Sequence, residues 1–86
     1  MSFDYVKTSS EIKDIISKIA RMDRENIRDD SRLRDELFID SLLAIQIAAL
    51  IEKKYQIKLD ETEIFNVDNV KDIVDLVKEY SENKEK

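Results

Sequence analysis

The chain has 86 residues, a formal net charge of −5, and no cysteine, histidine, glycine or proline. This length allows one domain with one small core, and the acidic balance argues against nucleic acid or an anionic membrane as a partner. The missing cysteine and histidine exclude a disulfide framework, a thiol nucleophile, the usual general base and the commonest metal ligands.

The first predicted helix follows residues 1–7, which we expect to be loosely held. They lack the basic start and apolar stretch of a signal peptide, so the expected location is cytoplasmic. Thr8-Ser9-Ser10-Glu11 has the spacing of a capping box. The pattern predicts a helix that ends near Arg21. Its apolar stripe has helical spacing and consists of Ile12, Ile15, Ile16, Ile19 and Ala20.

Residues 22–39 form a long connector, which is uncommon in a compact domain and often functional. Ile27, Leu33 and Leu37 are spaced as anchors that hold it against the core, and residues 36–38 are expected to form a helical turn. No metal site is predicted, because its acids lack the spacing and the glycine of a calcium loop.

At Asp40-Ser41 the polar connector gives way to an apolar run that ends at Ile51. Asp is a favoured N-cap, so Ser41 is expected in the first helical turn, facing water. An anion attached to its hydroxyl would lie at the positive end of the helix dipole. The run is shorter than the ~20 apolar residues of a membrane span. In so small a domain, part of this helix should stay exposed.

A helical wheel divides the helix predicted from Ser41 to about Tyr55 into two sides. The core side consists of Ala44, Ile47, Ala48, Ile51 and Tyr55, flanked by Leu43 and Leu50. The other side presents an apolar strip next to Gln46 and Lys53, formed by Leu42, Ile45 and Ala49. Such a strip is typical of a site for a partner or ligand, although it could instead pack under a loop.

The remaining elements are shorter. Residues 56–60 are expected to be an extended connector, and a short helix follows from Asp60 or Glu61 to Asn66. Asp68 is expected to cap a last helix that ends at about Tyr80, with residues 81–86 as a loosely held tail. The sequence therefore predicts one all-α domain over residues 1–86, a small bundle of three main helices plus one short helix, with a long loop between helices one and two.

Independent catalysis is not expected. A nucleophilic Ser41 would need a base and an oxyanion hole, and without histidine the usual triad is impossible. Lys53 and Lys54 lie about three turns away along the helix. What remains is a serine that another protein modifies, beside an apolar helix face that proteins or a lipid-like cargo contact.

Around this serine the chain resembles the acyl carrier proteins and their peptidyl carrier relatives, over about residues 10 to 80. The resemblance rests on Asp40-Ser41-Leu42 between a long loop and an apolar helix. Matching positions in the loop are Ile27, Leu33 and Asp35-Glu36-Leu37. Later matching positions are Ile47, Ile51, Tyr55, Ile57, Leu59, Val67 and Val70.

The resemblance implies that a separate phosphopantetheinyl transferase attaches 4′-phosphopantetheine from coenzyme A to Ser41, which makes the chain a phosphoprotein. The arm ends in a thiol that carries acyl groups as thioesters, and Asp40 would cap the helix and help loading. Acyl-transferring or synthase enzymes would contact the second helix at Leu42, Ile45, Gln46 and Ala49. An acyl chain would lie in the bundle interior beside residues such as Ile47, Ile51, Leu59 and Ile64. For any one of these four, simple core packing is the better explanation.

Two departures from the family pattern bear on the pathway. Phe38 stands where the family usually has glycine, and a phenylalanine does not take positive φ cheaply, so the loop is expected to differ there or to cover the arm. The second helix has Leu43 and Gln46, then Lys53 and Lys54, where fatty-acid carriers have acids, so partner recognition should be mainly hydrophobic. We therefore expect a monomeric carrier of a specialised fatty-acid, polyketide or peptide pathway, with its cargo left open.

An alternative from another class stays open. The chain would then be a small helical adaptor that docks a partner on the exposed strip, with Ser41 unmodified. A lone hydrolase is a third possibility, against which the missing histidine argues.

Overall fold

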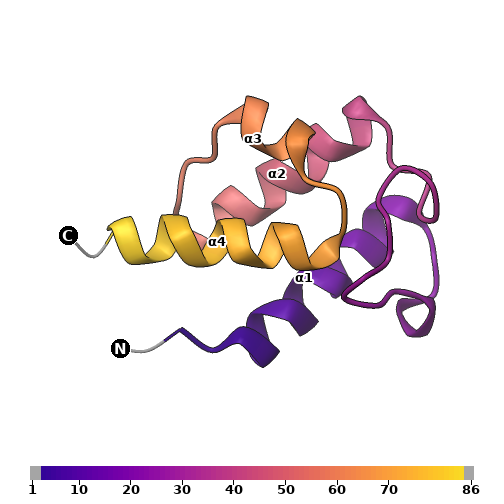
Figure 1. Cartoon of the computed structure of the whole chain (residues 1–86), viewed down its shortest axis with the longest axis horizontal. Coiled ribbons are helices and arrows are strands. Elements are labelled where there is room, and N and C mark those ends of the chain that lie inside the picture. Colours follow the sequence, from indigo (N-terminus) through magenta and orange to yellow (C-terminus); the bar gives the residue numbers. More distant parts are fainter. Residues whose placement is uncertain (1–2, 85–86) are drawn as a thin grey trace.

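The computed structural model describes residues 3–84. Within these residues four α-helices follow one another, and the connector between the first two contains a short 3-10 helix, η1 (Arg24–Asn26). α1 packs against both α2 and α4, and α3 packs against α2 (Figure 1). This arrangement confirms the predicted small all-α bundle with a long first connector. The four helices are α1 (Tyr5–Ala20), α2 (Ser41–Tyr55), α3 (Glu61–Asn66) and α4 (Val70–Lys84).

α1 begins earlier than the sequence pattern predicted. Its N-cap is Asp4, whose carboxylate accepts a hydrogen bond from the Lys7 amide at 3.0 Å. Thr8 and Ser9, the start of the predicted capping box, instead lie buried inside the helix. Residues 5–7 of the predicted lead-in are therefore helical, and residues 1–2 lie outside the described part of the chain.

Three buried apolar side chains hold the connector against the core, as its spacing predicted. Ile27, Leu33 and Leu37 are each less than a tenth exposed. The predicted helical turn lies slightly earlier than expected, at residues 33–36. The connector is thus an ordered part of the domain rather than a free loop.

The middle of the connector also covers the start of α4. The Leu33 amide donates to the Asp68 carbonyl at 2.9 Å, and the Val70 and Lys71 amides donate to connector carbonyls at 3.2 and 2.8 Å. The first amides of a helix have no partner within it, so these bonds satisfy donors that would otherwise need water or a side-chain cap.

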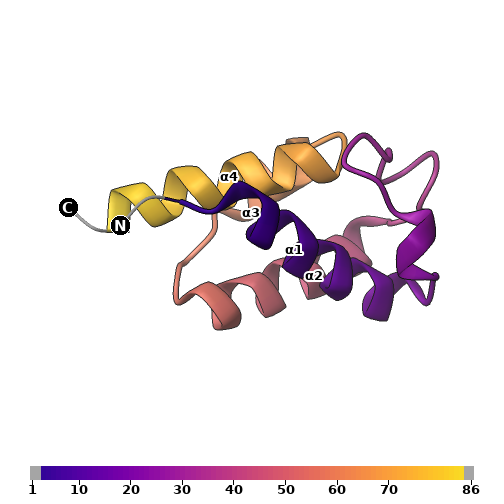
Figure 2. The same ribbon diagram turned by 90° about the horizontal axis from the view of Figure 1, so that it is seen from below.

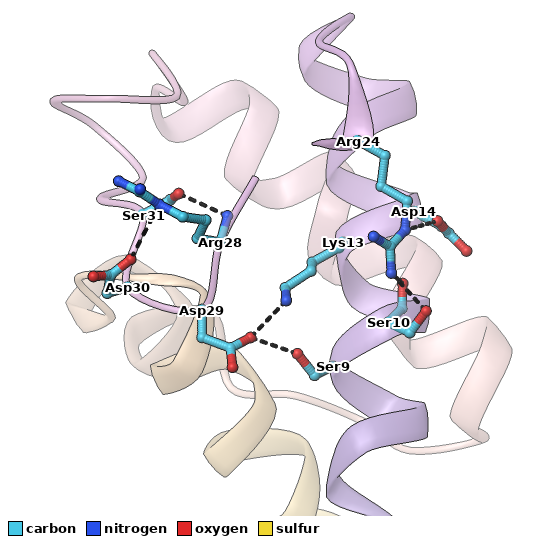
Figure 3. A network of polar contacts seen from close by, with 9 residues as sticks. All are labelled: Ser9, Ser10, Lys13, Asp14, Arg24, Arg28, Asp29, Asp30 and Ser31. Carbon is cyan, nitrogen blue, oxygen red and sulfur yellow. Dashed lines mark hydrogen bonds and ion pairs between the residues drawn. The ribbon is translucent and has the colours of Figure 1, made fainter. Parts of the chain in front are cut away.

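Side chains tie the same connector to α1 (Figure 3). Asp29 accepts a hydrogen bond from the Ser9 hydroxyl at 2.7 Å, and its carboxylate lies 2.8 Å from the Lys13 ammonium. Farther along α1, the Arg24 guanidinium pairs with Asp14 at 2.6 Å. The hydrogen bond from Lys13, followed by that from Ser9, lowers the pKa of Asp29.

α2 runs from Ser41 to Tyr55, as predicted. Ile47, Ala48 and Ile51 are buried, as the wheel assigned them. At the C-terminal end the Tyr55 hydroxyl donates to Glu11 of α1 at 2.7 Å.

The last two helices have side-chain caps. α3 spans Glu61–Asn66, within the predicted bounds, and its N-cap is Asp60, which accepts from the Thr62 amide at 2.9 Å. The cap of α4 was predicted wrongly, because Asn69 rather than Asp68 accepts from the Asp72 amide, at 2.9 Å. α4 also continues past Tyr80 to Lys84, so the helix includes most of the segment expected as a tail.

The bundle is elongated, with extents of 35, 25 and 19 Å. The end of α4 lies at one end of the long axis and the connector lies at the other, with the start of α1 between them (Figure 2). α2 starts at the connector end (Figure 1). Among the described residues, no helix is both long and apolar enough to cross a membrane.

Candidate functional site

The candidate site is centred on Ser41, the first residue of α2. Asp40 is the N-cap, and its carboxylate accepts a hydrogen bond from the Leu43 amide at 2.9 Å. The Ala44 amide donates to the Asp40 carbonyl, also at 2.9 Å, which closes the first helical turn. Both Asp40 and Ser41 are exposed to solvent. The helix start is therefore fixed by its own cap, and the serine is left accessible to another molecule.

The electrostatics at this position favour an anion. The N-terminus of an α-helix carries a partial positive charge, worth typically ~0.3–1 kcal/mol to a nearby anion. Ser41 lies at that end of the 15-residue helix α2. A phosphate ester on the serine would thus be stabilised by the helix that presents it.

A hollow of about 20 Å³ lies directly beside Ser41, between the connector, α2 and α3. A volume of this size holds about one water molecule. Of the four acyl-chain candidates, Ile64 lines the hollow, whereas Ile47, Ile51 and Leu59 are buried in the core. An alkyl chain could enter only if side chains or α3 moved. The lining residues are Leu33, Arg34, Ile39, Asp40, Ser41, Ala44, Ile64, Phe65 and Val67.

Apolar side chains are exposed on the outer face near Ser41. Leu42 is 64% exposed and Ile45 is 40% exposed, and Gln46 and Ala49 are exposed as well. The structure therefore places all four predicted partner-binding residues on the surface of α2. Phe38 adds a fifth side chain, 74% exposed, that was not among the predicted partner-binding residues. We call Phe38, Leu42, Ile45 and Ala49 the apolar face.

The backbone at Phe38 differs from expectation. Its φ is +55°, so the phenylalanine adopts the left-handed conformation that the sequence analysis expected it to avoid. The turn before it imposes this conformation, because the Glu36 and Leu37 amides both donate to the Arg32 carbonyl at 3.0 Å. The Ile39 amide then donates to the Leu33 carbonyl at 2.8 Å. The loop therefore follows the path that a glycine would allow, with a large side chain exposed at that point.

Sequence reasoning also missed Arg34. Its guanidinium donates to the Phe65 carbonyl of α3 at 3.0 Å, and both residues line the hollow. Arg34 and Phe65 are 31 positions apart in the chain, so no local pattern signals their contact.

The fold and the site define a class of protein: a small helical domain that presents one serine at a helix start for covalent attachment of a group. Comparison with known families agrees, because the family described as "Phosphopantetheine attachment site" matches residues 10–77. The chain therefore belongs to the acyl carrier protein family, whose cofactor is 4′-phosphopantetheine.

Individual relatives are similar over most of the chain. Acyl carrier protein 1 of the polyketide-8 synthase of Streptomyces avermitilis is 29% identical over 73 residues, which cover 85% of this chain and 87% of that protein. An acyl carrier protein of Chloroherpeton thalassium is 30% identical over 79 residues, which cover 92% of this chain and 96% of that protein. A non-reducing polyketide synthase of Emericella nidulans is 33% identical over 75 residues, which are 87% of this chain but 3% of that protein.

Membership of the family gives the chain a carrier role, and it implies interaction with synthase and transferase enzymes. Carrier proteins of this family are generally not catalysts themselves.

Proposed function

We propose that Ser41 is the residue that receives 4′-phosphopantetheine and that the chain carries acyl intermediates as thioesters. The observation that carries this proposal is the exposed Ser41 at the first position of α2, next to the Asp40 cap. The residues present fit the group, since the hydroxyl is accessible and the phosphate would lie at the positive end of a helix.

The protein's own residues would do three things in this role. Asp40 holds the start of α2 through its bond to the Leu43 amide, which fixes the direction of the serine. The helix N-terminus stabilises the negative charge of the phosphodiester. The arm supplies the thiol that holds the acyl group, and no cysteine of the chain competes with it.

The apolar face supports recognition by partner enzymes through hydrophobic contact. A contiguous exposed apolar patch on a small protein is typical of an interaction site. The partners in this proposal are a phosphopantetheinyl transferase and acyl-transferring or synthase enzymes, and the chain acts as a non-catalytic, cytoplasmic monomer. Phe38 and Leu42, the two most exposed side chains of this face, would give most of the contact area.

The pathway in this proposal is a specialised one. The second helix offers a single acid, Glu52, and has Lys53 and Lys54 exposed at its end, so electrostatic attraction to a basic partner would be weak. The similarity to a polyketide carrier of Streptomyces avermitilis supports a polyketide route. Specialised fatty-acid and peptide pathways fit the same surface.

Intact mass tests the attachment. The purified chain is incubated with coenzyme A and a broad-specificity phosphopantetheinyl transferase. We expect a gain of one phosphopantetheine group, which Ser41→Ala abolishes. Ser10→Ala on α1 serves as a matched control and should still be loaded. An unchanged mass of the wild-type chain would refute the proposal and favour the second candidate, a helical adaptor that docks a partner on the apolar face.

A further inference from the structure

Arg34 is the cation among the described residues that line the hollow beside Ser41. It comes from the connector, and its guanidinium donates to the Phe65 carbonyl oxygen at 3.0 Å. This hydrogen bond joins two walls of the hollow, the connector and the last turn of α3. Several of the other lining residues are apolar, including Ile39, Ala44 and Ile64.

The position of the guanidinium follows from the end of α3. The last carbonyls of a helix have no partner within the helix and carry partial negative charge. Phe65 is the next-to-last residue of α3, so its carbonyl is such an acceptor. An arginine stays positively charged at all ordinary pH values, so it can donate to this carbonyl at any of them.

The two ends of α3 are held by different partners. At the start of α3, the Asp60 amide donates to the Tyr80 hydroxyl at 3.2 Å, and that hydroxyl donates to Glu63 at 2.8 Å. At the end of α3, Arg34 supplies the bond to the connector. Movement of the last turn of α3 away from the connector would break the Arg34 bond, while the Tyr80 contacts at the start of α3 could persist.

The hollow as it stands is too small for an acyl chain. Its volume of about 20 Å³ matches one water molecule, and Ile64 on its wall is only 3% exposed. A chain tethered at Ser41 can therefore enter the bundle only after this wall moves. Arg34 supplies the side-chain bond to α3 that opposes that movement, and the backbone bond from the Leu33 amide to the Asp68 carbonyl holds the segment just after α3.

We propose that Arg34 holds the hollow closed and so determines which cargo this carrier keeps outside the bundle. This inference rests on the proposed function, because the cargo is an acyl group tethered through Ser41. With the Arg34 bond in place, the carrier leaves its acyl group accessible to partner enzymes and solvent. That state suits short or polar acyl groups, whereas a long alkyl chain would gain from burial in an opened bundle.

The test compares wild type with Arg34→Met, which keeps a long side chain but removes the guanidinium. Arg32→Met is the matched control, because Arg32 is an exposed arginine of the same turn that pairs with Asp35 and does not line the hollow. The broad-specificity phosphopantetheinyl transferase loads each protein from acetyl- or octanoyl-coenzyme A, transferring the acyl-phosphopantetheine to Ser41 and releasing adenosine 3′,5′-bisphosphate. The rate at which hydroxylamine cleaves the thioester is then followed by intact mass, relative to the same thioester on free pantetheine.

We expect octanoyl cleavage to slow by about two- to tenfold in Arg34→Met relative to wild type, the effect of losing one hydrogen bond on an opening equilibrium. Acetyl cleavage should not change in any of the proteins, and Arg32→Met should behave as wild type. Three results would overturn the inference: equal octanoyl rates in wild type and Arg34→Met, equal slowing of acetyl and octanoyl, or the same slowing in Arg32→Met. A purely structural role of Arg34 would not produce dependence on chain length.

A second measurement works on the unmodified chain. Amide hydrogen exchange at residues 64–67 should be about two- to tenfold faster in Arg34→Met than in wild type or Arg32→Met, because the same bond opposes opening. Equal exchange in all three proteins would also overturn the inference. Failure of loading, seen as an unchanged mass, would refute the proposed function and with it the role in cargo selection, while the exchange measurement, which does not need the arm, would still show whether Arg34 holds the hollow closed.

Discussion

The left-handed backbone at Phe38 gives a sharp test of the structure. Because the side chain is 74% exposed, its truncation removes little buried area. At φ of +55° an alanine retains the Cβ clash, which costs roughly 1–2 kcal/mol, whereas glycine avoids it. On folding, glycine loses more backbone conformational freedom than alanine, which costs ~0.4–1 kcal/mol of stability. We therefore expect Phe38→Gly to be more stable than Phe38→Ala by about 0.5–1 kcal/mol.

Urea unfolding followed by circular dichroism measures this difference. With an m-value of about 1 kcal/mol/M for a small domain, the midpoint of Phe38→Gly should lie about 0.5–1 M above that of Phe38→Ala. Leu42 is the matched control, because it is similarly exposed but lies in a helix, where glycine is worse than alanine by about 1 kcal/mol. The reasoning is refuted if alanine equals or exceeds glycine in stability at position 38 while the Leu42 pair shows the expected order.

Three further substitutions test the cap, the core and the connector. Asp40→Ala removes the cap of α2 and should lower the free energy of unfolding by about 1 kcal/mol, with Asp40→Asn close to wild type; equal urea midpoints for all three proteins would contradict the cap. Ile51→Ala should cost about 2–5 kcal/mol, because Ile51 is fully buried, and Leu42→Ala should cost far less; similar losses would argue against this assignment of the core. The hydrogen bond from Lys13 lowers the pKa of Asp29 below 3.8 in the folded state, so its stabilising contribution is complete above the unfolded pKa and is lost as pH falls through the folded pKa. As the pH falls from about 5 to about 2, Asp29→Asn should therefore lose less stability than wild type. If the urea midpoints of the two proteins fell equally over that range, Asp29 would make no such contribution.

The features that agree best with the sequence-based predictions are those that depend on the local spacing of apolar residues. The bounds of α2, the bounds of α3 and the buried anchors of the connector agree with the structure. The exposed strip formed by Leu42, Ile45 and Ala49 also agrees, because a wheel drawn for an apolar helix separates the sides once the core side is assigned.

The errors arise where neighbouring polar residues compete or where tertiary contacts decide. Asp68 and Asn69 are both residue types that cap helices well, so the sequence could not decide which one caps α4. In the structure Asn69 is the cap, and its backbone also pairs with Arg32 of the connector. At Phe38 the hydrogen bonds of the preceding turn override the residue's own backbone preference. Arg34 meets Phe65 only after the chain has folded, so its role is invisible to any local pattern.

The arrangement of the chain ends has a practical consequence. The start of α1 and the end of α4 both lie away from the connector, whereas α2 starts near it (Figure 1). A linker, an affinity tag or a neighbouring domain joined before α1 or after α4 would therefore start away from the end of the molecule that holds the serine. Immobilised on a support through either end, the protein should orient Ser41 outward, toward whatever enzyme approaches from solution.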